Sequence, residues 1–182
     1  MRLLLIRHGR SAHAHDGTWL DLPRAREFEK RYDAASIRPD DQPPEHLVAL
    51  GRNATTLMAS DLPRAMASIE RLAPGRDAMI SPLLREVYFD IPAWGPRLPM
   101  EVWDMLHYAM WTGRMFSRLE HAEMKRAREA AAWVDERATD LTLAVTHGGF
   151  RRLLARQLAT RGWKRRGPRS YANWSAWEMV RD

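Results

Sequence analysis

The stretch RLLLIRHGR at residues 2–10 places a short apolar run directly before Arg7, His8 and Gly9. The run 3–6 lacks the alternation of a strand with one solvent face, so it predicts a strand buried on both faces. Three further apolar runs also end in polar residues: TTLMA (55–59), AMISPLL (78–84) and LTLAV (141–145). We therefore expect a sheet that is covered on both sides.

Helical periodicity fills the intervals between these runs. Ser60 and Asp61 are good helix-capping residues, Pro63 suits a first helical turn, and apolar residues then recur every three or four positions as far as Leu72. The same spacing occurs at 102–110, 118–137 and 149–159. Strands that alternate with helices predict an α/β fold, a three-layer α/β/α sandwich with a mostly parallel central sheet.

Two further segments complete the predicted organisation. SAWEMV (175–180) alternates better than the other runs and predicts a strand at a sheet edge. Residues 33–46, with three prolines among acids, predict an exposed loop. A chain of 182 residues without internal repeats or linkers is expected to form a single domain over 1–182.

Composition restricts the class of protein. Apolar residues make up 45% and charged residues 29%, as in soluble globular proteins. The lack of Cys excludes disulfides and thiolate chemistry and is compatible with a reducing compartment. No segment approaches the roughly 20 apolar residues of a membrane span. We expect a cytoplasmic protein with no membrane partner.

The formal net charge of +6 comes mainly from Arg. Coding bias towards Arg is one explanation, and an anionic substrate is the other, because guanidinium groups match phosphate oxygens in pairs. The most basic stretch, RGWKRRGPR (161–169), lacks a recognisable nucleic-acid-binding module. We interpret it as a solvated loop and predict no nucleic-acid partner.

The predicted strand ends carry the residues that suggest chemistry. In open α/β sheets ligands bind beyond the carboxyl ends of the strands. His8 and His147 follow the first and last of the four buried runs, Glu86 follows the third, and Arg64 lies one helical turn past the second. With Arg7 they form a collection that lacks the ligand pattern of a metal site, so no metal is predicted.

Four motifs carry a family resemblance: LIRHG (5–9), SDLPRAMAS (60–68), LLREVYF (83–89) and VTHGG (145–149). In this order they resemble the histidine phosphatase superfamily, also called phosphoglycerate mutase-like, over nearly the whole chain. The resemblance implies that fold, no cofactor and a phosphohistidine intermediate on His8. It further implies that His147 donates to the phosphoryl oxygens, most usefully as a cation, and that Glu86 protonates the leaving oxygen and then activates water.

Further residues are predicted to bind phosphate. Arg7 and Arg64 supply fixed charge with bidentate geometry. Ser11 occupies a position where family members often carry a small hydroxyl residue, with a simple loop hydroxyl as the alternative. Gly148 lets the backbone approach the anion closely. For Glu86 the alternative is a surface ion pair with its neighbour Arg85.

These residues predict a metal-independent phosphomonoesterase of the histidine acid phosphatase type, acting on a small-molecule phosphorylated substrate. The alternatives are a phosphoglycerate mutase-type phosphotransferase, a phosphohistidine-protein phosphatase and a non-catalytic phospholigand-binding module. Family members that act as mutases or sugar-phosphate phosphatases commonly carry Asn at the place of Ala14 and Gly at the place of Asp90. These departures disfavour the mutase.

The segment 90–116 is rich in Trp and Met. We expect it to form an insertion or partial lid, with Arg97 or Arg114 touching substrate; the alternative is that it packs the core or a homodimer surface. His13 and His15 are expected to line the mouth of the site or to face solvent.

Overall fold

The computed structural model describes residues 1–13, 17–87, 97–99, 102, 105 and 120–182. The main sheet has six strands in the spatial order β4 (Met79–Ser81), β3 (Thr56–Ser60), β6 (Leu141–Thr146), β1 (Arg2–Arg7), β8 (Ala176–Val180) and β7 (Lys164–Arg166). The first four are parallel neighbours, whereas β8 runs antiparallel to both β1 and β7. The predicted mostly parallel sheet is confirmed.

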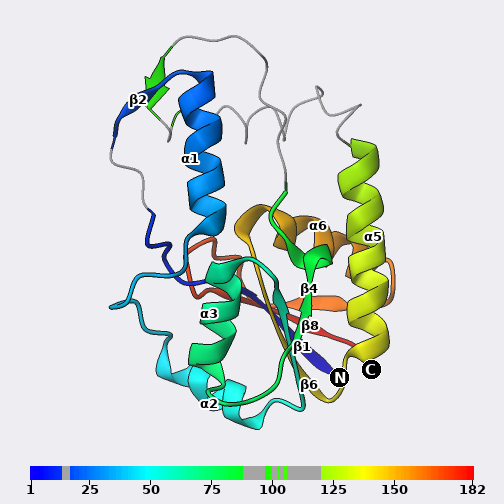
Figure 1. Ribbon diagram of the computed structural model, residues 1–182. Coiled ribbons are helices and arrows are strands. Elements are labelled where there is room, and N and C mark those ends of the chain that lie inside the picture. Colours follow the sequence, from blue (N-terminus) through cyan, green and yellow to red (C-terminus); the bar gives the residue numbers. More distant parts are fainter. Residues whose placement is uncertain (14–16, 88–96, 100–101, 103–104, 106–119) are drawn as a thin grey trace.

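Alternate residues of β1 contact opposite layers. Leu3 and Leu5 belong to the cluster that includes α5 (Glu120–Arg137) and α6 (Gly148–Ala159). Leu4 and Ile6 belong to the cluster on the other face, which includes the other two covering helices, α2 (Glu45–Asn53) and α3 (Pro63–Leu72). In Figure 1, α2 and α3 lie on one side of the strands and α5 on the other. The predicted three-layer sandwich is therefore confirmed.

Both helices that follow site strands carry polar residues on their buried faces. Arg64 and Ser68 are buried in α3 together with its apolar residues. In α6, Arg151 is buried beside Phe150 and Leu154. Because a buried polar group needs partners or a ligand, these positions direct attention to the strand ends.

Residues 33–46 contain the predicted loop, which spans 35–44, and most of the segment is exposed. Helix α1 (Leu22–Ala34) precedes the segment and α2 begins directly after Pro44. Between the helices, Ile37 and Asp41 are both 4% exposed. They are the buried positions of the loop, which pairs with the segment after β1 through a bridge between Ser11 and Ile37.

The carboxy-terminal prediction needs correction. β8 is an internal strand, since β7 pairs with it and forms the edge. The stretch 161–169, interpreted as a loop, contains β7, whose residues are all exposed. A short strand of cations has no apolar signal in the sequence, and charged residues are a common protection of sheet edges.

The remaining elements are a short second sheet of β2 (Trp19–Leu20) and β5 (Leu98–Pro99), and the 3-10 turn η1 (Pro82–Leu84). The first and last strands lie close together, and the amino group of Met1 donates to the carbonyl of Arg181 at 2.8 Å. No helix in the described ranges combines the length and apolar character that a bilayer crossing requires.

Candidate active site

The two predicted histidines meet at the carboxyl ends of β1 and β6. These strands are parallel neighbours with Arg7 paired to Thr146, so the residues that follow emerge side by side. The His8 amide donates to the Thr146 carbonyl at 3.0 Å. The rings of His8 and His147 have centroids 4.9 Å apart and planes tilted by 56°. The two side chains converge as the sequence predicts.

The ring of His8 is oriented by one short hydrogen bond. Its Nδ1 lies 2.6 Å from the Gly9 carbonyl oxygen, which only accepts, so Nδ1 carries a proton. Burial lowers the pKa of His8 to about 3, the charges of Arg64 and Arg7 add to that shift, and the Gly9 hydrogen bond opposes it. His8 is therefore neutral near pH 7 and has its lone pair on Nε2, the form that a nucleophile requires.

His147 is held through its other nitrogen. Its Nε2 lies 3.0 Å from the hydroxyl of Ser60, at the end of β3. That hydroxyl accepts from the Leu62 amide at 3.3 Å, so its own proton can be donated to Nε2. When Nε2 accepts in this way, the proton of the neutral His147 ring is on Nδ1, which is buried and has no hydrogen-bond partner.

The expected imidazolium form of His147 is disfavoured in this environment. Burial lowers the pKa of His147 well below its ordinary value, and the neighbouring His8, Arg64 and Arg7 lower it further. A neutral ring with its proton on Nδ1 still donates one hydrogen bond. An anion bound beside it would favour the protonated ring.

The two predicted arginines are fixed at their terminal nitrogens. Arg64 is 1% exposed and donates to the Tyr32 carbonyl and to Asp33 Oδ1, both at 3.0 Å. Arg7 donates from Nη1 to the Tyr171 carbonyl at 2.5 Å. In both side chains Nε is buried and has no partner. Each guanidinium is thus held at a terminal nitrogen while its buried Nε–H has no acceptor.

Arg151 is a third arginine at this edge that sequence reasoning missed. It is fully buried and donates to the Ser170 carbonyl and to the hydroxyl and carbonyl of Ser175. Burial lowers the pKa of Arg151 to about 10, and the positive charge of Arg7 contributes. The sequence contained a signal, because Arg151 lies three residues before Leu154 on the apolar face of the helix.

Unpartnered donors collect at this edge of the sheet. Within the described ranges, buried side-chain nitrogens that lack a hydrogen-bond partner occur in Arg7, His13, Arg64, His147 and Arg151. A buried donor without an acceptor costs about 1–3 kcal/mol. An anion with several oxygens would supply acceptors and offset the mutual repulsion of the cations. This arrangement has the donors to bind a compact polyoxygen anion.

The side chain of Glu86 contacts the amino terminus of α6, the helix that begins directly after His147. Its Oε1 accepts from the Phe150 amide at 2.8 Å, and its Oε2 accepts from the Gly149 amide at 3.3 Å. A surface ion pair between Glu86 and Arg85 was the alternative, but Arg85 pairs with Asp61 at 2.6 Å. Glu86 is therefore aimed at the helix that begins beside the two histidines.

Ser11 and Gly148 lie in the same region with different surroundings. The Ser11 hydroxyl accepts from the His13 amide at 3.2 Å, and its backbone bridges to Ile37. A Cβ atom on Gly148 would lie 3.3 Å from Arg7 Nε, so glycine avoids a tight contact with the unpartnered nitrogen. Contact of either residue with phosphate stays a prediction.

His13 lies beside an aromatic face of α1. Its ring centroid is 4.4 Å from that of Phe28, whose ring stacks on Tyr32 at 6.4 Å. Tyr32 in turn lies under the guanidinium of Arg64, with Cζ 4.5 Å from the ring centroid. The half-buried His13 is thereby connected to the anion site through aromatic contacts.

The proposed lid cannot be placed. Most of the segment 90–116, including Arg114, lies outside the described residues, as does His15. Of the lid residues that are described, Arg97 is exposed, and 98–99 pair with β2.

Comparison with known proteins agrees with this geometry. Residues 3–179 match the histidine phosphatase superfamily (branch 1). No curated protein matches the chain.

Several solved structures share the fold at low sequence identity. A phosphoserine phosphatase from Entamoeba histolytica, in complex with 3-phosphoglyceric acid, is 15% identical and has a TM-score of 0.56, with 87% of this chain and 80% of that chain covered. The alpha-ribazole phosphatase from Shigella flexneri is 21% identical, with a TM-score of 0.52 and coverages of 87% and 79%. The family match spans nearly the whole chain, so this protein belongs to the histidine phosphatase superfamily and is an enzyme of the phosphatase or phosphotransferase type.

Proposed function

We propose that this protein is a metal-independent phosphomonoesterase that works through a phosphohistidine on His8. The observation that carries the proposal is the position of His8, a neutral ring with its lone pair on Nε2, among buried donors that lack acceptors. A nucleophile surrounded by donors for an anion is the arrangement that phosphoryl transfer requires.

The binding step uses the arginines and His147. A phosphate monoester carries a charge of about −1.5 to −2 near pH 7. The Nε atoms of Arg7 and Arg64 and Nδ1 of His147 donate to its oxygens, which neutralises charge that grows as the phosphoryl group is transferred. The same donors serve the second half-reaction, because the phosphoryl group stays between them.

Two displacements complete the reaction. In the first, Nε2 of His8 attacks phosphorus, the ester P–O bond breaks, and the leaving oxygen takes a proton from the carboxylic acid of Glu86. In the second, Glu86 takes a proton from water, the water oxygen attacks phosphorus, and the P–N bond breaks to regenerate His8. We assign the proton to Oε2, since it accepts the longer hydrogen bond, 3.3 Å from Gly149, whereas Oε1 accepts two shorter ones.

The substrate we propose is a small phosphorylated molecule with water as acceptor. Product analysis tests this acceptor. Release of inorganic phosphate indicates hydrolysis, an isomerised substrate indicates a mutase, and turnover confined to phosphohistidine proteins indicates the protein phosphatase of the family.

The direct test is hydrolysis of p-nitrophenyl phosphate in EDTA by the wild type and by His8→Ala. We expect EDTA to leave the wild-type rate unchanged and His8→Ala to lose activity by about 10⁴-fold or more. His46→Ala, which removes an exposed histidine of α2, is the matched control and should behave as wild type. Activity that survives in His8→Ala would exclude the mechanism, and loss in EDTA would exclude metal independence.

A further inference from the structure

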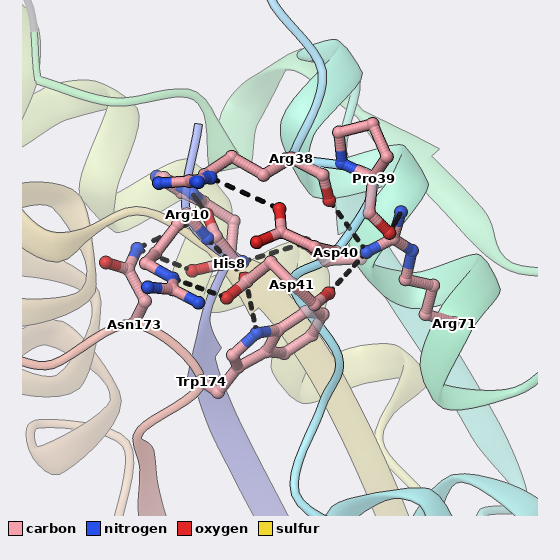
Figure 2. Close-up of polar contacts among 11 residues, drawn as sticks. His8, Arg10, Arg38, Pro39, Asp40, Asp41, Arg71, Asn173 and Trp174 are labelled. Atoms are coloured by element: carbon pink, nitrogen blue, oxygen red, sulfur yellow. Dashed lines mark hydrogen bonds and ion pairs between the residues drawn. The ribbon is translucent and has the colours of Figure 1, made fainter. Parts of the chain in front are cut away.

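The loop that carries His8 is held by residues from the opposite end of the chain. The side-chain amide of Asn173 donates from Nδ2 to the carbonyl of His8 at 2.9 Å and to that of Gly9 at 3.3 Å. Figure 2 shows Asn173 pointing at the backbone of this loop from the segment that precedes β8. Asn173 is 165 residues away from His8 in the sequence, so this contact beside the nucleophile depends on the tertiary fold.

Trp174 fixes the position of Asn173. Its amide donates to the Arg7 carbonyl at 3.1 Å, and its indole nitrogen donates to Asp41 Oδ2 at 2.7 Å. Trp174 has a φ of 60°, a left-handed conformation that a bulky residue rarely adopts. Such conformations persist only where the surroundings impose them, and they are frequent at functional sites.

Asp41 connects Trp174 to the loop that carries His8. Its carboxylate is 4% exposed and accepts from the amide and from Nε of Arg10, both at 2.6 Å, in addition to the indole. A Cβ atom on Gly9 would lie 2.5 Å from the Trp174 ring and 2.6 Å from Asp41 Oδ2. The indole and the carboxylate therefore abut the Cα of Gly9. Figure 2 shows the indole of Trp174 beside the carboxylate of Asp41.

The carbonyl of Gly9 connects Asn173 to the ring of His8. The Gly9 carbonyl oxygen accepts from Nδ1 of His8 and also from Nδ2 of Asn173. A carbonyl has two lone pairs, so one oxygen can serve both donors. Whatever fixes the direction of this carbonyl also fixes the tautomer and the direction of the imidazole ring.

Resting on the proposed function, we infer that Asn173 is a positioning residue for the nucleophile. Its amide orients the Gly9 carbonyl, that carbonyl retains the proton on Nδ1 of His8, and Nε2 is left bare and aimed at phosphorus. Trp174 and Asp41 hold the amide in register with the loop. Asn173 does not contact the phosphoryl group in this scheme, so it should affect turnover rather than binding.

The test is Asn173→Asp, which keeps the shape of the side chain and replaces the donating NH₂ with an oxygen that repels both carbonyls. We expect kcat to fall by about 10–100-fold, as for other groups that orient a functional histidine, while KM for p-nitrophenyl phosphate stays unchanged. Asn53→Asp is the matched control, because Asn53 is exposed and donates to the Ala49 carbonyl within α2. It should retain the wild-type kcat.

A readout that does not depend on activity is the tautomer of His8, measured by NMR of ¹⁵N-imidazole-labelled protein with the signal assigned through His8→Ala. The wild type should carry the proton on Nδ1, and Asn173→Asp should shift the population towards Nε2. Asn173→Ala, which adds no charge, serves if the first variant does not fold. An unaltered tautomer or a wild-type kcat in a folded Asn173 variant would overturn the inference. If the wild type fails as a phosphatase, the proposed function fails, and the tautomer still decides the role of Asn173.

Discussion

Two clusters of arginine in this protein differ in whether their guanidinium groups are paired with an acid of the protein. In the first, Asp135 accepts from Arg161 at 3.1 Å, from the indole nitrogen of Trp163 at 2.7 Å, and from Arg181. Burial raises the pKa of Asp135, but hydrogen bonds from Trp163 and Arg161 outweigh it, so the net shift is downward. This Asp135 cluster has its charges paired within the protein.

The second cluster, at the ends of β1, β3 and β6, keeps donors that the protein itself does not pair. Arg7, Arg64 and Arg151 each have a buried Nε without a partner. Of the carboxylates nearby, Glu86 accepts from backbone amides, and Asp33 pairs with Nη2 of Arg64 but not with its Nε. Charge alone therefore does not locate a site. Buried donors that lack an acceptor distinguish the second cluster from the first.

The largest effect that separates the clusters is expected at their acids. Glu86→Gln keeps one oxygen that can accept from the Phe150 amide, loses the second acceptor and carries no transferable proton, so kcat for an alkyl phosphate should fall by about 10²–10³-fold. The loss should be smaller for p-nitrophenyl phosphate, since its leaving group needs little protonation. Asp135→Asn is the control and should leave kcat unchanged. An equal loss of kcat in the two variants would contradict the functional distinction between the two clusters.

The next effect concerns the cations. Arg64→Ala removes a hydrogen bond to a charged ligand, and KM for a phosphate monoester should rise by about 10- to 100-fold. Arg161→Ala deletes an arginine that is already paired with Asp135, so steady-state kinetics should match the wild type. A similar rise in both variants would mean that overall positive charge, not the unpaired donor, attracts the substrate.

Because His8 is buried in its neutral form, we expect the free energy of unfolding to depend on pH. The pKa of His8 is about 3 in the folded state against an ordinary value of 6.5. Below pH 6.5 the unfolded chain binds a proton that the native state refuses, so stability falls as pH drops, by up to about 1.4 kcal/mol per pH unit, until the folded pKa is reached.

Urea denaturation at pH 7 and pH 5 measures this effect. The free energy of unfolding of the wild type should decrease by about 2 kcal/mol more than that of His8→Asn over this interval. His46→Asn, at an exposed position, should retain the wild-type dependence. The same pH dependence in all three proteins would contradict a buried neutral His8.

The smallest effect is expected at the rim. Asp33 is 40% exposed and holds Nη2 of Arg64, so it competes with a bound anion. Asp33→Asn should strengthen phosphate binding by about 2- to 5-fold, the range of an exposed ion pair. Asp40→Asn, which removes the exposed pair with Arg38, is the control for isothermal titration. Weaker phosphate binding in Asp33→Asn would show that Asp33 supports Arg64.

Much of this architecture was predictable from short-range patterns. The run 3–6 has no polar alternation, and the structure buries both faces of β1. Parallel strands bring their ends to one edge, which was enough to predict that His8 and His147 meet. The spacing from Pro63 onward likewise predicted α3 and the placement of Arg64 on it.

The rest depends on contacts that sequence separation conceals. Asp41 lies in a segment whose prolines suggested exposure, yet Trp174, 133 residues away, buries it. Asn173 lies next to Trp174 in the turn that precedes β8, and its contact with His8 spans 165 residues. The role of Ser60 has no sequence signal either. Its hydroxyl contacts His147 only because β3 and β6 are neighbours in the sheet.

The account stands most directly on covalent transfer to His8. Rapid acid-free quenching of the enzyme during turnover of a phosphate monoester, followed by intact-protein and peptide mass spectrometry, measures it. The account predicts that the wild type gains the mass of one phosphoryl group, located on His8, and that His8→Ala gains none. Steady turnover by a wild type that never carries this group, or phosphorylation of the His8→Ala protein, would contradict it.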